Sequence, residues 1–255
     1  MILRRLGNKK KIAAKIAAFF PPHEAYIEPF FGAGGMFFNK PRAKFNACND
    51  IDKDVFNLFM VLKERAEEFE ETFRSTPIDD NLFQYWRENE ETDEIWRAVR
   101  FVYLSRFGYL GMPGALRSNI FSELHSFLNL PKDAIKNVLF FSSDFEKFIN
   151  NLIFREGFND CKRTLIYCDP PYLSTGNNYS QGFAPEDTER LFRVCREMSD
   201  KGCKVAISEF DNPDVCEIAQ RYGFNKIVIG ERQSMKNRST EVLFTSYKIN
   251  QLSLF

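Results

Sequence analysis

The chain has 255 residues with 35 basic and 35 acidic side chains, so its formal net charge is zero. This length suits one α/β domain with an insertion and a large buried core, and zero net charge argues against a protein that merely coats nucleic acid. No apolar run approaches the roughly 18 residues that a membrane-spanning helix needs, so we expect no membrane partner. The basic N-terminal stretch has no apolar segment after it, and we expect no signal peptide.

Cysteine and histidine usage narrows the class of protein further. The six cysteines are scattered and form no Cys-x-x-Cys pair, a pattern typical of reduced thiols in a cytoplasmic protein. The two histidines lie far apart in the sequence, which argues against a zinc site, and we expect no bound metal.

The N-terminal residues combine a turn with a basic helix. Gly7–Lys9 is a turn signal, and the apolar spacing over residues 10–20 predicts a helix that a Pro-Pro pair ends. Residues 1–15 hold six basic side chains and no acid. These side chains either form a solvated helix face or lie near a ligand or a phosphate backbone, and Lys10 is our candidate for the second role.

The first strand is predicted at residues 26–30, followed directly by the glycine-rich Phe31–Gly35 and a helical pattern from Met36. Glycines let the chain turn sharply into a helix and let a ligand approach the backbone closely. The dinucleotide pattern Gly-x-Gly-x-x-Gly is absent. Many nucleotide-binding folds have such a turn, so it indicates a ligand loop without identifying the ligand.

A second strand, at residues 45–48, ends in the polar sequence Asn-Asp-Ile-Asp. An acid at this place, roughly 20 residues after the glycines, can accept hydrogen bonds from ribose hydroxyls, and Asp50 is our candidate. The alternative is that an acid caps the helix predicted over residues 52–62, and Asp52 fits that role better.

Residues 63–134 differ from the α/β pattern around them. Helical periodicity covers 63–74, 79–90 and 92–107, and an irregular stretch rich in Gly and Pro follows. The segment holds nine basic and fourteen acidic side chains, and the acids concentrate in its first half, which we expect to be a solvated outer face. A strand at 138–141 then resumes the α/β pattern, with a helix after it that reaches about residue 154.

The most informative stretch is Leu165–Tyr172, where mostly apolar residues run into Asp169, Pro170, Pro171 and a tyrosine. The apolar run predicts a buried strand, and the prolines end it because they have no N–H for a sheet ladder. Ligands of open α/β sheets bind at the carboxyl ends of the strands. The Asp169 carboxylate, the Pro170 carbonyl and the aromatic ring are therefore candidates for catalysis, and an ordinary Pro-rich turn is the alternative.

The rest of the chain alternates helices and strands. A polar loop is predicted over 173–185. The elements expected after it are helices at 186–199 and 213–222 and strands at 204–208, 226–229 and 242–247. The loop between the last two strands carries Lys236 and Arg238, either as an exposed basic loop or as a contact to phosphates.

Three of these features together resemble a known family. Phe-x-Gly-x-Gly at residues 30–34, an acid after the second strand and the Asp-Pro-Pro-Tyr turn resemble the amino-methyltransferases that use S-adenosylmethionine. Their order, with a long insertion before Asp-Pro-Pro-Tyr, is similar to the Dam-type (D12 class) DNA adenine-N6 methyltransferases over nearly the whole chain. Gly7–Lys9 resembles that family's Trp-x-Gly-Gly-Lys cofactor motif, with Arg5 in place of the Trp and Asn8 in place of a Gly.

The resemblance implies a fold and a division into domains. The fold is the α/β, Rossmann-like fold of S-adenosylmethionine-dependent methyltransferases, a mixed seven-stranded sheet with an inserted helical target-recognition domain. The catalytic domain would comprise residues 1–62 and 135–255, and the inserted domain residues 63–134.

The inserted segment contains another motif of the family. Residues 100–111 are similar to the family's Leu-Asn-Arg-Tyr-Gly-Tyr-Asn-Gly stretch, in which Tyr109 matches the aromatic. Leu110 replaces the Asn, and Gly114 stands where GATC-specific members carry an Arg, so the resemblance does not carry over GATC specificity. Arginines here could contact guanines and phosphates. The DNA-binding candidates are Lys10, Arg106, Tyr109, Arg117, Lys236 and Arg238.

The resemblance also implies a cofactor site and partners. By position, Asp144 and Phe145 would lie beside the adenine of S-adenosylmethionine, and the alternative for Asp144 is a helix N-cap. The cofactor-binding candidates are Arg5, Gly7, Lys9, Glu28, Pro29, Phe30, Gly32, Gly34, Asp50, Asp144, Phe145 and Asp169. The implied partner is double-stranded DNA and, in a restriction–modification setting, a cognate restriction endonuclease.

The implied reaction is methyl transfer to the N6 amine of adenine. This amine is a poor nucleophile because its lone pair is delocalised into the ring. Asp169 and the Pro170 carbonyl can each accept one N–H and so localise the lone pair, while Tyr172 stacks on the base and Pro171 stiffens the turn. In duplex DNA the base must first leave the stack.

Two alternatives stay open at this point. A cytosine-N4 methyltransferase would use the same acid and prolines, since these can bind any exocyclic amine, although the domain order favours adenine. A DNA-binding homologue without catalysis would explain the acidic insertion and the missing Trp and Arg. Such a protein, however, has no need for an intact Asp-Pro-Pro-Tyr turn.

Overall fold

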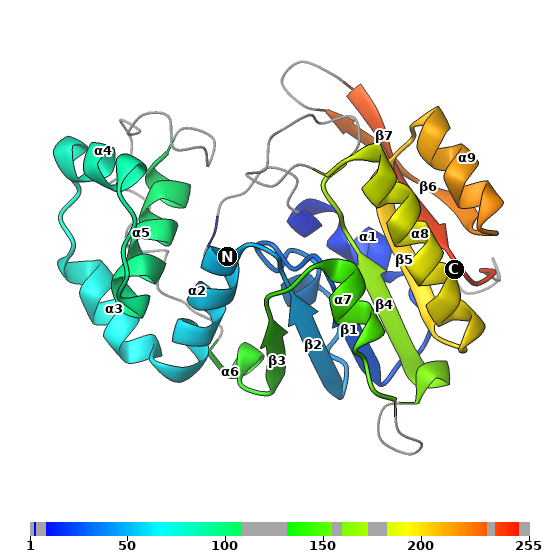
Figure 1. Ribbon diagram of the computed structural model, residues 1–255, viewed down its shortest axis with the longest axis horizontal. Helices are drawn as coiled ribbons and strands as arrows, with labels where there is room; N and C mark the ends of the chain where they lie inside the picture. Colours follow the sequence, from blue (N-terminus) through cyan, green and yellow to red (C-terminus); the bar gives the residue numbers. More distant parts are fainter. Residues whose placement is uncertain are drawn as a thin grey trace.

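The computed structural model describes residues 3, 9–108, 132–154, 160–172, 183–233 and 238–249. Within them, the strands are β1 (Ala25–Glu28), β2 (Phe45–Asn49), β3 (Val138–Phe141), β4 (Thr164–Cys168), β5 (Lys204–Phe210), β6 (Asn225–Gln233) and β7 (Arg238–Thr245). They form one seven-stranded sheet in the order β3-β2-β1-β4-β5-β7-β6 (Figure 1). Strand β7 is antiparallel to both neighbours and the other pairs are parallel, which confirms the predicted mixed sheet.

The middle of the sheet is buried on both faces, as the apolar runs predict. Every residue of β1 and β4 is buried. Successive side chains alternate between the faces, so Leu165 and Tyr167 join one hydrophobic core and Ile166 and Cys168 join the other. Since the prolines that follow cannot extend the ladder, β4 stops at the carboxyl edge of the sheet.

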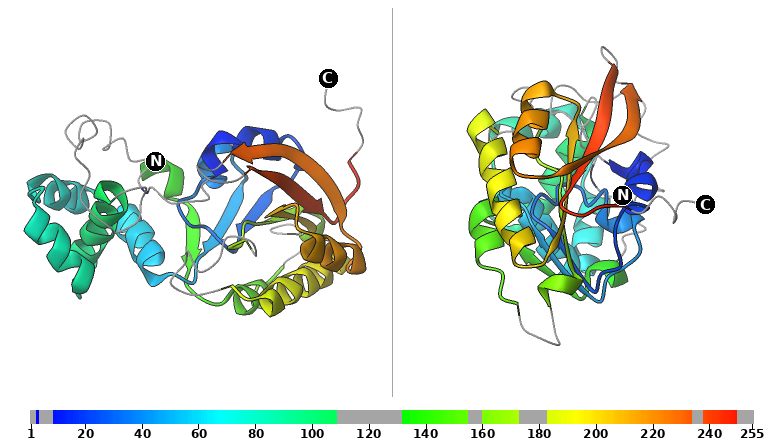
Figure 2. Two further views of the ribbon diagram at one scale, coloured as in Figure 1. Left: turned by 90° about the horizontal axis from the view of Figure 1, so that it is seen from above. Right: turned by 90° about the vertical axis from the view of Figure 1, so that its right-hand side faces the viewer.

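Helices cover both faces of the sheet (Figure 2). One face is covered by α7 (Phe145–Asn150), α8 (Pro185–Asp200) and α9 (Pro213–Arg221). The other face carries the 3-10 turns η1 (Lys9–Lys11) and η2 (Phe37–Asn39) and the helices α1 (Ala13–Ala17) and α2 (Lys53–Glu64), while the turn η4 (Cys161–Arg163) leads into β4. In the described part of the chain, no helix combines the length and the apolarity that a membrane span requires.

The inserted segment forms a helical lobe beside the edge strand β3 (Figure 1). Its helices are α3 (Ala66–Ser75), α4 (Asp80–Glu88) and α5 (Glu94–Phe107), and α6 (Lys132–Ile135) leads back to β3. Aromatic rings fill the lobe, because Tyr103 lies edge-on to Trp86 and Phe107 with centroids 5.0 and 4.6 Å apart. Helix α2 joins the lobe to the sheet: it packs against α5, and its Phe59 stacks on Phe140 of β3 at 5.4 Å.

Three helix predictions differ from the structure. The helix expected over residues 10–20 is divided into η1 and the short α1, because Lys9 turns into the protein interior. The helix expected from Met36 is the three-residue turn η2, which Pro41 cannot continue. The helix expected to reach residue 154 ends at Asn150.

Candidate active site

The carboxyl ends of three parallel strands bring acids to one edge of the sheet. Strand β1 ends at Glu28, β2 is followed by Asp50 and β4 by Asp169, with β1 lying between β2 and β4. Burial raises the pKa of Glu28 well above its usual range, and the charges of Asp169 and Asp50 add to that rise. The Asp-Pro-Pro-Tyr turn thus lies where α/β sheets bind their ligands.

Lys9 forms an ion pair with Asp169. Its Nζ lies 2.7 Å from Asp169 Oδ1 and 3.4 Å from Glu241 Oε1. The side chains of Lys9 and Glu241 are only 2% and 1% exposed, so each charge needs the other. The Asp169 side chain is 21% exposed. Asp169 is therefore the most exposed member of the trio formed by Lys9, Asp169 and Glu241.

Tyr172 is held by the same residues. Its hydroxyl donates a hydrogen bond to Glu241 Oε1 at 2.5 Å, and the Lys9 ammonium lies over its ring, 4.4 Å from the centroid. Phe210 of β5 meets the ring edge-on at 4.6 Å. A base that stacks on Tyr172 must therefore use the face away from Lys9, or Lys9 must move.

Burial sets the ionisation of these groups. It raises the pKa of Asp169 above its usual range; the charge of Lys9 offsets part of this rise, and that of Glu241 adds to it. Burial also raises the pKa of the Tyr172 hydroxyl well above its usual range, with the charges of Asp169 and Glu241 adding to the effect. Tyr172 is therefore a neutral donor near neutral pH, and the charge of Asp169 depends on Lys9.

The glycine loop after β1 is shaped by Asp50. The Gly32 N–H donates to Asp50 Oδ2 at 2.6 Å, and the Asp52 N–H donates to Oδ1 at 3.0 Å. Asp52 itself caps α2, as predicted. The φ angles of Gly32 and Gly34 are 52° and 68°, which favours glycine at both positions. A Cβ would meet nothing within 4 Å at Gly32 but would lie 2.5 Å from the Phe38 ring at Gly34, so there is open space beside Gly32 but not beside Gly34.

Glu28 is buried together with Tyr26 and Lys40. The Tyr26 hydroxyl donates to Glu28 Oε2 at 2.9 Å, and Lys40 lies over the Tyr26 ring, with its Nζ 3.7 Å from the centroid. Burial lowers the pKa of Lys40 to about 8, and the charge of Glu28 opposes that shift. A buried cation therefore lies near the buried acid at the end of β1.

Asn49 connects two loops of this edge. Its Nδ2 donates to the carbonyls of Pro29 and Ser143, both at 3.0 Å, and its Oδ1 accepts from the Ser143 N–H at 3.0 Å. The residue is 1% exposed. Asn49 therefore ties the loop after β1 to the loop after β3.

Asp144 and Phe145 open α7. Asp144 Oδ1 accepts from the N–H groups two and three residues later, at 3.0 and 3.3 Å, which is the N-cap role named as its alternative. Its Oδ2 pairs with Arg190 at 2.5 Å. Arg190 also lies over the Phe145 ring at 4.6 Å, and Phe30 packs against Phe145 at 5.3 Å. Contact of Asp144 and Phe145 with the cofactor stays a prediction.

The predicted DNA contacts are only partly described. Lys10 is exposed on η1, and Arg106 is half-buried in the last turn of α5. Arg238 begins β7 opposite Gln233. The candidates that lie outside the described residues are Arg5, Gly7, Tyr109, Arg117 and Lys236, together with the positions Leu110 and Gly114.

Sequence reasoning does not single out several buried polar residues of this edge, among them Glu241, Asn49 and Lys40. A signal exists for the first two, because each borders a buried apolar run in which an unpaired polar side chain is unfavourable. No pattern in the sequence marks Lys40.

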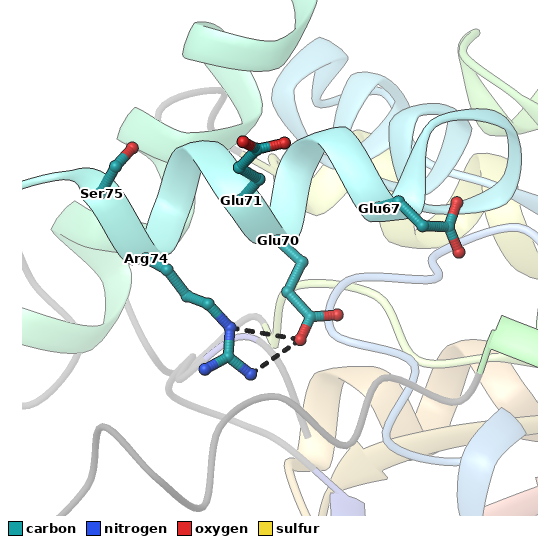
Figure 3. A pocket seen from close by; sticks show the side chains of 5 residues that line it. All are labelled: Glu67, Glu70, Glu71, Arg74 and Ser75. Carbon is teal, nitrogen blue, oxygen red and sulfur yellow. Dashed lines mark hydrogen bonds and ion pairs between the residues drawn. The ribbon is translucent and has the colours of Figure 1, made fainter.

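A surface hollow lies apart from this edge, on α3 of the helical lobe (Figure 3). It is lined by Glu67, Glu70, Glu71, Arg74 and Ser75, and Arg74 pairs with Glu70 at 2.8 Å. The three acids would repel a phosphate, so we do not assign this hollow to the site. Among the described residues, no group of three His, Cys, Asp or Glu side chains is placed to hold a metal ion.

The chain is similar to known proteins over most of its length. The family described as D12 class N6 adenine-specific DNA methyltransferase matches residues 6–235. The DNA adenine methylase of Escherichia coli (strain K12) is 28% identical over 240 residues, which cover 86% of this chain and 84% of that protein. The type II methyltransferase M1.LlaDCHI of Lactococcus lactis subsp. cremoris is 23% identical, with 94% and 93% covered. The retron Ec67 DNA adenine methylase of Escherichia coli is 25% identical, with 96% and 90% covered.

Proposed function

Because this chain belongs to the D12 class of N6 adenine-specific DNA methyltransferases, we propose that Asp169, Pro170, Pro171 and Tyr172 are its catalytic residues. Members of this class transfer the methyl group of S-adenosylmethionine to the N6 amine of adenine in DNA. The placement of Asp169 supports the proposal most strongly. It directly follows β4 at the carboxyl edge of the sheet, where α/β sheets bind ligands. It is also the most exposed of the three ion-paired residues Lys9, Asp169 and Glu241.

The glycine loop fits S-adenosylmethionine, which supplies an electrophilic methyl group when bound. Open space beside Gly32 lets a ligand lie against the backbone, and the carboxylate of Asp50 suits ribose hydroxyls. A cofactor ammonium group beside Glu28 would favour the ionised form of that buried acid. The proposed cofactor-binding residues are Lys9, Glu28, Pro29, Phe30, Gly32, Gly34, Asp50, Asp144, Phe145 and Asp169, with Arg5 and Gly7 from outside the described part.

Asp169 and the Pro170 carbonyl act on the target amine as hydrogen-bond acceptors. Each takes one N–H, so the nitrogen lone pair is localised for attack on the methyl group. The two prolines have fixed φ angles, which keep both acceptors in place before the base arrives. The raised pKa of Asp169 also lets its carboxylate hold the proton that the amine loses after methyl transfer.

Tyr172 supplies the stacking surface for the target base. The Lys9 ammonium occupies one face of its ring, so the base uses the opposite face. Before the amine binds, the Lys9 ammonium lies 2.7 Å from Asp169 and compensates its negative charge.

The substrate is double-stranded DNA whose target adenine flips out of the helix. Asp169 is largely buried, and a base inside the stack would not reach it. Residues 63–134 are the proposed target-recognition domain, and residues 1–62 and 135–255 the catalytic domain. The proposed DNA contacts are Lys10, Arg106, Tyr109, Arg117, Lys236 and Arg238.

The cellular setting is also a proposal. All six cysteines are free thiols, which supports a cytoplasmic location. The type II designation of the Lactococcus relative supports a cognate restriction endonuclease as a partner.

Methylome sequencing tests the function directly. DNA from a methylation-deficient host that expresses the parent chain should carry N6-methyladenine in one short motif, and DNA from an Asp169→Ala host should carry none. The variant should fold, because residue 169 lies in a turn and Lys9 keeps Glu241 at 3.4 Å.

The other outcomes separate the alternatives. A variant rate above about a tenth of the parent's contradicts the mechanism, since losing one acceptor should lower the rate roughly 100-fold. N4-methylcytosine would favour the cytosine enzyme. A folded parent that binds DNA and modifies nothing would favour the DNA-binding homologue.

A further inference from the structure

Glu241 is a charged residue in a place where strands are normally apolar. It lies on β7 between β5 and β6, opposite Phe210 on one side and Gly230 on the other. Its side chain is 1% exposed, and residues 242–244 after it are buried and apolar. A carboxylate in such a place is stable only when it is paired, so its partners indicate its role.

Two partners of Glu241 belong to the candidate active site. Its Oε1 accepts the Tyr172 hydroxyl at 2.5 Å and lies 3.4 Å from Lys9 Nζ, which continues to Asp169. Phe210, opposite Glu241 in the ladder, meets the Tyr172 ring at 4.6 Å and 79°. Glu241 of β7 and Phe210 of the neighbouring β5 therefore hold the hydroxyl and the ring of Tyr172.

From these contacts the structure assigns Glu241 the role of a positioning residue: it orients the Tyr172 ring for the target base and holds Lys9 between two acids. The inference rests on the proposed function, because it concerns the same base and the same Asp169. Without the Glu241 carboxylate, the Tyr172 hydroxyl loses its charged acceptor, and Lys9 pairs with Asp169 alone.

Glu241 also acts on the ionisation of Asp169. Both carboxylates contact one Nζ, so their oxygens lie within about 6 Å of each other, a range at which a negative charge hinders a neighbouring acid from ionising. Lys9 opposes this effect. Among the described residues, the other titratable groups that interact with Asp169 are Tyr172, Tyr167, Glu28 and Cys168. A neutral Gln at position 241 should therefore lower the pKa of Asp169.

The test compares methyl transfer by the parent and Glu241→Gln across pH on one DNA duplex. We expect kcat to fall about 10-fold with KM for DNA within about two-fold, and the acid limb of the kcat profile to move about one pH unit lower. The matched control is Glu231→Gln, an exposed Glu on the neighbouring β6, which should behave as the parent. A folded Glu241→Gln with parental kcat and an unmoved acid limb overturns the inference.

Tyr172→Phe keeps the inference testable if Glu241→Gln does not fold. It removes only the hydroxyl, and we expect a comparable fall in kcat. A parental kcat would show that the hydrogen bond to Glu241 does not orient the Tyr172 ring. Where Glu241→Gln does fold, a double-mutant cycle of the two changes, measured by urea unfolding, needs no activity, and additive effects mean that Glu241 does not hold Tyr172. If the parent methylates no DNA, the proposed function fails while this cycle still decides the contact.

Discussion

Replacing Lys9 with methionine removes one charge from a buried trio and keeps an unbranched apolar stem. Lys9 Nζ lies 2.7 Å from Asp169 and 3.4 Å from Glu241, and its side chain is 2% exposed. Losing one partner of a buried ion pair costs about 3–5 kcal/mol. Because the Asp169 side chain is 21% exposed and can be protonated, we expect Lys9→Met to lower the free energy of unfolding by about 3 kcal/mol at pH 8.

The loss of unfolding free energy in Lys9→Met should depend on pH, and the contacts of Asp169 give the direction. Without Lys9, burial and the Glu241 charge raise the folded-state pKa of Asp169 further above its unfolded value. The folded variant then binds more protons than the unfolded chain, so its stability is retained at low pH and falls as the pH rises through the folded pKa. The difference from the parent should shrink to about 1–2 kcal/mol at pH 5.

Urea unfolding at pH 5, 6, 7 and 8 measures this difference. The control is Lys10→Met, the exposed neighbour on the same turn, which should stay within about 0.5 kcal/mol of the parent at each pH. A Lys9→Met variant as stable as the control, or a loss that does not change with pH, would refute the reasoning that Lys9 compensates two buried acids.

Two further predictions concern the glycine loop. Asp50→Ala should weaken S-adenosylmethionine binding about 10-fold in calorimetry, because one charge-assisted contact and the Gly32 N–H acceptor are lost; an unchanged dissociation constant would rule out the ribose role. Gly34→Ala should lower the free energy of unfolding by about 3 kcal/mol and Gly32→Ala by about 1 kcal/mol, since both have positive φ but only Gly34 is packed against a ring. Equal losses in urea unfolding would show that this packing does not matter.

Much of the fold could be predicted from apolar runs. The central strand β4 is covered on both faces, so its sequence is a continuous apolar stretch that predicts it. The edge strand β3 is also an apolar run, although Leu139 and Phe141 are exposed. The helix predicted over residues 10–20 is shorter in the structure, Ala13–Ala17, and its spacing does not show that Lys9 turns inward to reach Asp169. Asp144 shows the opposite case, because its capping role is local and was named from sequence as an alternative.

Sequence patterns alone predict that Asp169 and the glycine loop lie at the ends of strands. A Pro-Pro pair must end a strand, and a glycine turn after a strand must lie at the carboxyl edge of a parallel sheet. The meeting of Lys9, Asp169 and Glu241 at one place depends instead on how distant elements pack together. They come from a 3-10 turn, a strand end and an antiparallel strand far apart in the chain. Local patterns report which face a residue occupies, whereas the pairing of buried charges depends on how distant elements pack.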